Sequence, residues 1–208
     1  MKMVKWRLAL LFFPLCACLA DGEKETREIL EKTIDKGVAI LKDTSLDNDT
    51  RINAFDTLLN ESCHLDLMAM LSLGKTHWMA FTPEQREEFI KSYTRLIVRS
   101  YYEKIKQVDT TDIAVTYTKN EAVSKTKREL EATMRAGETI LNVVYKFTMR
   151  NTGWGVYDVE IEGVSLIVSY RSQFNDFLAT RPPEELLSEL AKDDNGFKPA
   201  KQSPEPLE

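Results

Sequence analysis

The side chains best suited to chemistry in this chain are two histidines and one cysteine, and their spacing is unfavourable for catalysis. Cys63 directly precedes His64, but adjacency in sequence does not create a nucleophile–base pair. His64 and Asp66 are two residues apart, so on a helix they would not face each other. We therefore interpret His64 and His77 as structural or surface residues, and Cys63 as a small buried side chain. A reactive thiol, or an enzyme acting on lipid or peptide through His64 or Cys63, is the alternative hypothesis.

Motifs that would hold a metal or a cofactor are missing from the sequence. It contains no Cys-x-x-Cys pair, no His-Glu-x-x-His motif, no glycine-rich phosphate loop and no nucleophile elbow. Its carboxylates fall mostly where solvent-facing helical positions are expected. The sequence therefore predicts no metal, no cofactor and no enzymatic activity.

Residues 1–20 have the charge order of a secretory signal peptide. Three basic residues within the first seven precede an uncharged apolar run, 8–20, which is too short for a comfortable bilayer crossing. We predict cleavage after Ala20 and export from the cytoplasm as a free protein. Alternatively, Leu15-Cys16-Ala17-Cys18 resembles the lipobox of a bacterial lipoprotein, with Cys18 as the lipidated residue.

The charge balance excludes two classes of partner. The net charge is −5, and losing the three basic residues of the signal segment would make it −8. An acidic chain lacks the electrostatic footprint of a nucleic-acid-binding protein and is not attracted to an anionic membrane surface.

Only Cys63 is certain to remain after processing, so the fold must rest on its core rather than on a disulfide.

The hydrophobic pattern changes from a helical to an alternating period and back again. Thr82 and Gln85 are placed to form a capping box in front of the longest apolar stripe. The helical segments are 23–42, 49–60, 65–73, 83–108, a segment from 166 that ends before Pro182, and 183–192. The alternating segments are 112–118, 122–132, which is more polar and reads as an edge strand, 139–150 and 154–162.

This order predicts an α+β fold in which several helices cover a small, curved, mainly antiparallel sheet. We expect a single domain over 21–192 and a flexible polar tail over 193–208, where three prolines interrupt the chain. The pattern alone does not decide whether the space between sheet and helices is filled or hollow, because apolar stripes usually form a core.

Two stretches resemble a known family. Residues 154–166, Trp-Gly-Val-Tyr-Asp-Val-Glu-Ile-Glu-Gly-Val-Ser-Leu, followed by Tyr-Arg-Ser-Gln-Phe at 170–174, are similar to the signature of the MlaC (toluene-tolerance) family. The segment from Leu71-Ser72-Leu73-Gly74 to Thr82-Pro83-Glu84-Gln85-Arg86 resembles the family's upstream motif. The resemblance spans roughly 23–192.

The resemblance implies a soluble periplasmic phospholipid carrier of an ABC transport system that maintains the lipid asymmetry of the outer membrane. The implied partners are a phospholipid with buried acyl chains, an inner-membrane ABC transporter complex with a ring-forming lipid-binding subunit, and an outer-membrane lipoprotein complex; we expect a monomer. The candidate lipid-binding residues share inward-facing apolar positions: Tyr93, Ile97, Tyr101, Leu141, Val143, Tyr145, Phe147, Tyr157, Val159, Ile161, Ile167, Tyr170 and Phe174. A carrier of another apolar lipid such as a hopanoid, and a structural or interaction module with a filled core, are the alternative functions.

Overall fold

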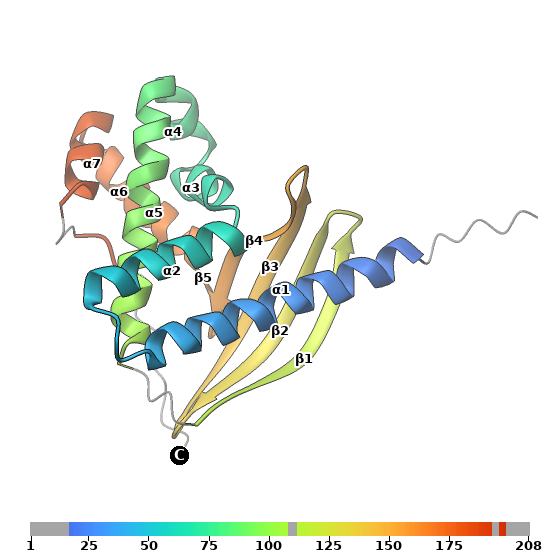
Figure 1. Cartoon of the computed structure of the whole chain (residues 1–208). Coiled ribbons are helices and arrows are strands. Elements are labelled where there is room, and N and C mark those ends of the chain that lie inside the picture. The colour runs from blue at the N-terminus through green and yellow to red at the C-terminus, as the bar shows by residue number, and fades with distance from the viewer. Residues whose placement is uncertain (1–16, 108–111, 193–195, 199–208) are drawn as a thin grey trace, which may run out of the picture.

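The computed structural model describes residues 17–107, 112–192 and 196–198, drawn in colour in Figure 1. Most of the predicted signal segment, 1–16, therefore lies outside the described residues. The described part contains seven helices and five strands. In chain order they are α1 (Ala17–Lys42), α2 (Asn48–Ser62), α3 (Leu65–Leu73), α4 (Lys75–Ala80), α5 (Pro83–Ile105), β1 (Ile113–Ser124), β2 (Lys127–Ala136), β3 (Thr139–Arg150), β4 (Gly153–Ile161), β5 (Val164–Ser165), α6 (Leu166–Leu178) and α7 (Pro183–Leu190).

The strands form one antiparallel sheet in the order β1-β2-β3-β4-β5. Short turns join consecutive strands, and Gly153 at the start of β4 has a positive φ (102°) that few other residues tolerate. The predicted α+β fold is confirmed. The prediction of an edge strand over 122–132 is wrong, because β2 lies between β1 and β3 and its alternate residues Leu130 and Ala132 are buried; β1 is the edge.

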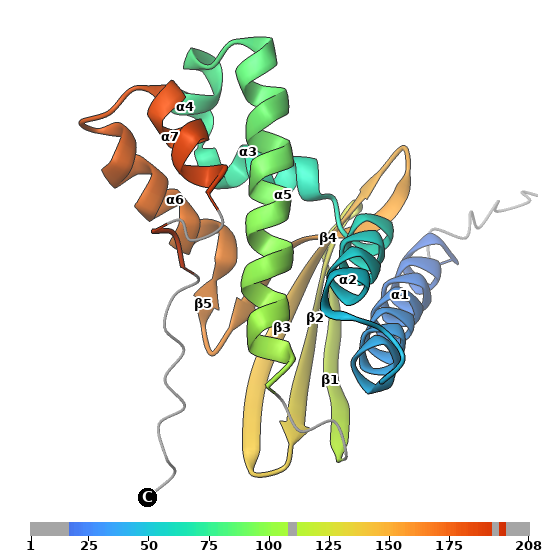
Figure 2. The ribbon, with the colours of Figure 1, turned by 60° about the vertical axis from the view of Figure 1, so that its left-hand side comes forward.

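The helices are distributed unequally over the sheet. Helix α1 crosses one face, which we call the inner face, while α3, α5, α6 and α7 stack together beside the β4 and β5 edge (Figures 1 and 2). The stacked helices have their own apolar core, here called the helical cluster. Its buried members are Leu65, Met68, Ala69, Leu73, Phe81, Phe89, Tyr93, Leu96, Ile97, Tyr170, Phe174, Leu186, Leu190 and Phe197.

A second core, the sheet cluster, lies between α1 and the inner face. Its buried members are Leu30, Leu130, Ala132, Phe147 and Val156. Cys63 packs against both clusters, so the apolar interior is continuous from the sheet to the stacked helices. Burial of these side chains, worth about 25 cal/mol per Å² of apolar surface, fixes the helices to the sheet.

The helix starts follow the sequence signals. Thr82 and Gln85 form the predicted capping box at α5, and the Ser165 hydroxyl accepts a hydrogen bond from the Val168 amide at the start of α6. Helix α4 and strand β5 were not predicted, because α4 is a single short helix and β5 has only two residues.

The polar contacts of α1 with the sheet are concentrated in its N-terminal half. The side-chain amide of Asn120 on β1 donates to the Glu23 carbonyl (2.9 Å) and lies 3.2 Å from the Thr26 hydroxyl. Thr26 is fully buried, and the Nε of the buried Arg128 donates to the Asn120 side-chain oxygen (3.0 Å). This network holds one end of α1 against β1 and β2.

The packed core extends beyond the predicted domain boundary at Lys192. Phe197 is buried, with its ring centroid 5.1 Å from that of Phe174. The Gln173 side chain makes two hydrogen bonds to the Lys198 backbone. The rest of the predicted tail, 193–195 and 199–208, lies outside the described residues.

Candidate functional site

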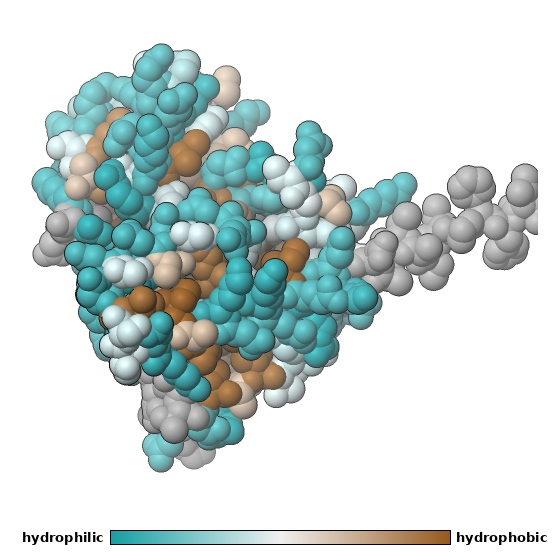
Figure 3. Space-filling model, viewed as in Figure 1, coloured by the Kyte–Doolittle hydropathy of each residue, from teal (hydrophilic) through white to brown (hydrophobic). Residues whose placement is uncertain are grey.

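A groove runs between the C-terminal half of α1 and the edge strand β1. Its volume is about 470 Å³, within the range of about 300–1,000 Å³ that is typical of ligand pockets. We call it the α1–β1 groove. The residues that line it are Glu31, Ile34, Asp35, Val38, Lys42, Ile113, Val115 and Tyr117. Figure 3 shows hydrophobic residues gathered beneath α1, where the sheet emerges from under the helix.

The walls of the groove follow from the two secondary-structure periods. Ile34 and Val38 are four residues apart on α1, so they point to the same side of the helix. Ile113, Val115 and Tyr117 alternate along β1 and therefore share the inner face. These apolar side chains form the walls, and Glu31, Asp35 and Lys42 contribute the charged groups. An apolar cleft with a few charged groups can accept hydrocarbon while a polar end stays in water.

The groove continues into the sheet cluster. Ile34, Val115, Tyr117, Tyr145 and Val159 are half-buried and pack against the buried members of that cluster. The Tyr145 hydroxyl donates to the Met134 sulfur at 3.4 Å, a weak acceptor, and burial raises the pKa of Tyr145 well above its ordinary value. A ligand in the groove would therefore meet apolar side chains on the side of the sheet cluster and the charged groups of Glu31, Asp35 and Lys42 along α1.

The structure places six of the thirteen predicted site residues on the inner face. Residues paired across β3 and β4 include Tyr145 with Val159 and Val143 with Ile161. The inner-face members of the prediction are Leu141, Val143, Tyr145, Phe147, Val159 and Ile161. Val143 and Phe147 are buried, and the other four are half-buried. The half-buried side chains keep part of their apolar surface accessible on the inner face.

Most of the remaining predicted residues lie among the stacked helices. Tyr93, Ile97, Tyr170 and Phe174 belong to the helical cluster, and Tyr101 packs against it. Ile167 is buried at the start of α6. The rings of the cluster are closely packed, with centroids of Tyr93 and Tyr170 5.9 Å apart and those of Tyr170 and Phe174 also 5.9 Å apart. These side chains form a filled aromatic core among the stacked helices, away from the β1 edge that borders the groove.

Tyr157 does not lie with Val159 and Ile161 as the alternation predicted. A β-bulge shifts the register so that Phe147 pairs with Val156 while Lys146 pairs with Asp158, which leaves Tyr157 as the extra residue. Its ring lies under Lys127 on the opposite, charged face (5.4 Å from Nζ to the centroid). Trp154 and Val156, which simple alternation would place opposite Val159, pack with it in the sheet cluster.

None of the residues that line the α1–β1 groove was among the predicted site residues. The signals were present, because Ile34 and Val38 lie in the predicted helical segment 23–42, and Ile113, Val115 and Tyr117 alternate in the predicted strand 112–118. Sequence periodicity identifies each apolar face separately but not which helix covers which strand. The pairing of α1 with β1 was therefore missed.

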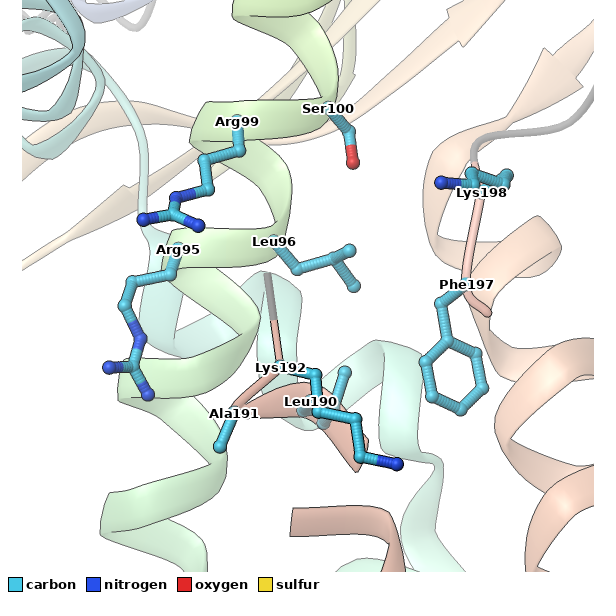
Figure 4. Close-up of a pocket in the computed structure, with 9 residues that line it drawn as sticks. All are labelled: Arg95, Leu96, Arg99, Ser100, Leu190, Ala191, Lys192, Phe197 and Lys198. Atoms are coloured by element: carbon cyan, nitrogen blue, oxygen red, sulfur yellow. The ribbon is translucent and has the colours of Figure 1, made fainter. Parts of the chain in front are cut away.

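A second cavity lies between α5, α7 and the segment around Phe197, and Figure 4 shows its lining. Its volume is about 90 Å³, too small for a lipid chain, and four of its nine lining residues are cationic: Arg95, Arg99, Lys192 and Lys198. In Figure 4 the guanidinium groups of Arg95 and Arg99 point away from Phe197, while Leu96 points towards it. Its size and charge make this cavity a poor acyl-chain site.

Two of the residues first considered for chemistry, His64 and Cys63, take part in the packing of the fold. A nitrogen of the His64 ring lies 3.2 Å from the Thr148 carbonyl oxygen, and the His64 backbone amide donates to Val156 (2.8 Å). Burial raises the pKa of the Cys63 thiol to about 11, so the reactive thiolate is disfavoured at neutral pH. Among the residues that the structure describes, no three His, Cys, Asp or Glu side chains are grouped as a metal site requires. The described helices include none with the length and apolar character to cross a bilayer.

Comparison with known proteins agrees with the fold and the motifs. The sequence profile of the MlaC protein family matches residues 31–192. No curated protein gives a significant sequence match. Among solved structures, the chain is similar to a phospholipid-binding protein from Ralstonia solanacearum that was solved in complex with a phospholipid. The two share 21% sequence identity with a TM-score of 0.68, over 79% of this chain and 94% of that one.

Proposed function

This chain belongs to the MlaC family, and from that premise we propose that it is a periplasmic carrier that holds phospholipid acyl chains in the α1–β1 groove. Members of the family carry lipid without catalysing a reaction, so the prediction that the chain is not an enzyme is confirmed by its family. The observation that carries the proposal is the groove itself. It has five apolar wall residues and a volume of about 470 Å³, whereas the cavity around Phe197 is small and cationic.

Physical chemistry supports hydrocarbon as the occupant. Each methylene group removed from water contributes about 0.8 kcal/mol. Burial of a long acyl chain therefore outweighs the free-energy cost of ordering the ligand. The inner face beyond the groove offers further half-buried apolar side chains, such as Leu141 and Ile161, which longer chains would cover. A structural module with a filled core would not leave this surface open.

A phospholipid is favoured over a hopanoid as the cargo. The structural relative from R. solanacearum was solved with a phospholipid, and the two folds correspond over most of both chains. The charged groups of Glu31, Asp35 and Lys42 beside the groove would suit a zwitterionic headgroup better than a wholly apolar polycycle. Family membership further supports an inner-membrane ABC transporter complex and an outer-membrane lipoprotein complex as the protein partners.

The test is whether the protein carries lipid and where. We expect protein purified from cells to release phospholipid on extraction with organic solvent, and native mass spectrometry to show a matching mass adduct. Val115→Glu places a carboxylate on the groove wall and should abolish most of the bound lipid, because a buried unpaired charge is costly.

Val123→Glu is the matched control, since Val123 lies on the same strand but is 58% exposed and outside the groove. Lipid-free protein that also fails to take up added lipid would disprove the carrier function. Extraction of a hopanoid in place of a phospholipid would keep the carrier and change its cargo. Equal lipid content in the two variants would show that the chains bind elsewhere.

A further inference from the structure

One end of the α1–β1 groove is closed by a contact between helix and strand. The guanidinium carbon of Arg27 on α1 lies 4.6 Å from the centroid of the Tyr117 ring on β1. The Nε of Arg27 also donates to the Glu31 carboxylate (2.8 Å). Tyr117 and Glu31 both line the groove, so Arg27 lies against two of its walls at this end.

A second set of polar contacts joins helix and strand just beyond the closed end. The Asn120 side-chain amide donates to the Glu23 carbonyl and lies within hydrogen-bond distance of the Thr26 hydroxyl. Along the groove itself, from Glu31 to Lys42, the described structure shows no hydrogen bond or ion pair between α1 and β1. Lys42 is exposed at the other end. The groove therefore has one end that polar contacts close and one end that borders solvent.

The closed end is charged, which makes it a barrier to hydrocarbon. Burial raises the pKa of the Tyr117 phenol, and the carboxylates of Glu31 and Asp35 raise it further, so both lie close to this side chain. Arg27 acts on the phenol in the opposite direction. An alkyl chain that pushed between Arg27 and Glu31 would displace water from an ion pair and offer no polar partner in return, which is costly.

The dimensions of the groove suit a single acyl chain. The axial distance from Glu31 to Lys42 is about 16 Å, at about 1.5 Å per helical residue. An extended alkyl chain advances about 1.3 Å per carbon, because its C–C bonds are about 1.5 Å long, so this distance accommodates about twelve carbons. The volume of about 470 Å³ would hold about sixteen methylene groups if each fills about 30 Å³, the share of a water molecule in the liquid.

We propose that Arg27 and Tyr117 form a stop that limits the length of the acyl chain held in the α1–β1 groove. The methyl end of the chain lies against this stop, and the polar end of the lipid lies near Lys42, whose ammonium group pairs with the phosphate. Methylene groups beyond the limit remain outside the groove, where the inner face covers them only in part. The inference rests on the proposed function and deepens it, because it names the feature that selects among acyl chains.

The experiment measures affinity as a function of chain length. The probes are saturated lysophosphatidylcholines with single chains of ten to eighteen carbons, which share one headgroup. Each is used below its micelle-forming concentration to displace a fluorescent fatty acid from the full chain, previously stripped of lipid. For the wild-type protein we expect about fourfold tighter binding per added methylene up to about fourteen carbons, and about twofold or less beyond that length.

Two variants remove the stop from opposite sides. After Arg27→Ala the next barrier is the Asn120 contact with Thr26, about one helical turn or about 5 Å further along α1, so the change of slope should move to chains about two to four carbons longer. Tyr117→Leu keeps an apolar wall but removes the ring that Arg27 covers, and it should produce the same lengthening.

Lys24→Ala is the matched control. Lys24 pairs with Glu28 as Arg27 pairs with Glu31, four residues apart on the same helix, but Lys24 and Glu28 do not line the groove. Its change of slope should coincide with that of the wild-type protein. Both ion pairs are exposed and contribute little to stability, so Arg27→Ala and Lys24→Ala should unfold at nearly the wild-type temperature.

The possible failures are distinguishable. A constant gain up to eighteen carbons in the wild-type protein, or an unchanged limit in both stop variants, would overturn the stop. A shift of the same size in Lys24→Ala would also overturn it, because any loss of charge on α1 would then suffice. Protein that binds none of these probes but still releases phospholipid on extraction would contradict the stop and keep the carrier. Protein that neither carries nor takes up any lipid would refute the proposed function itself.

Discussion

At the scale of single residues, a close contact explains why glycine occupies position 155 in the motif that resembles the MlaC signature. A Cβ atom on Gly155 would lie 2.8 Å from the His64 ring, closer than real contacts allow. His64 is in turn held between the Thr148 carbonyl and Val156. The histidine that looked like a candidate base is therefore a packing element, and the glycine makes room for it.

This contact predicts a coupled pair of substitutions. Gly155→Ala should lower the free energy of unfolding by about 1–3 kcal/mol, as overpacking does, measured by urea denaturation. Adding His64→Ala should recover part of that loss, since the clash disappears. Gly196→Ala is the control, because a Cβ there meets no atom within 4 Å, and its stability should be unchanged. Strict additivity of the Gly155 and His64 effects would contradict the account.

The thiol of Cys63 gives a pH prediction. Its pKa of about 11 lies above the ordinary value because burial disfavours the thiolate. Alkylation by iodoacetamide at pH 8 should therefore be slow at Cys63 in folded protein and should rise many-fold in urea. Peptide mass spectrometry resolves this site from the other cysteines. Below about pH 8 the thiol is largely protonated in both states and has little effect on stability. Between pH 9 and 11 only the unfolded thiol ionises, so stability falls as pH rises.

At the scale of elements, the sequence predicts the strands and helices with strong periodicity and fails where a single residue interrupts it. Segment 139–150 matches β3 and 65–73 matches α3, because each is bounded by turn residues. Tyr157 was assigned to the wrong face, because a β-bulge adds one residue that alternation cannot reveal. The groove was missed for a different reason, since it requires knowing that α1 lies over β1, a tertiary pairing that neither segment's pattern encodes.

The asymmetric attachment of α1 leads to a prediction about that helix. Asn120→Ala removes the acceptor of a buried Arg128 hydrogen bond and the link to Thr26 and Glu23. We expect a loss of about 1–3 kcal/mol in unfolding free energy. Amide hydrogen exchange should accelerate in the N-terminal half of α1 more than in α5. Asn60→Ala, which removes only an exposed bond within α2, serves as the control. Equal effects of the two variants would show that Asn120 does not anchor the helix.

At the scale of the whole molecule, the acidic charge and the proposed lipid groove together predict how a bound lipid would leave. Two long acyl chains represent about 20 kcal/mol of hydrocarbon burial, which corresponds to unassisted desorption on the order of 10⁻² per second. The net charge of −5 repels the protein from anionic bilayers and disfavours productive collisions with them. Rapid delivery then requires a docked partner that excludes water from the path of the chains.

Transfer of a fluorescent phospholipid from the purified protein to vesicles would test this reasoning. Without partners, we expect a half-time of about a minute or longer, because desorption limits the rate. The rate should not change when the vesicle concentration is raised tenfold, nor when anionic lipid replaces part of the zwitterionic lipid. A rate that increases in proportion to vesicle concentration would mean that this protein itself docks on membranes and hands over its lipid by contact. In that case the groove would open directly onto the bilayer, and the need for a protein partner would disappear.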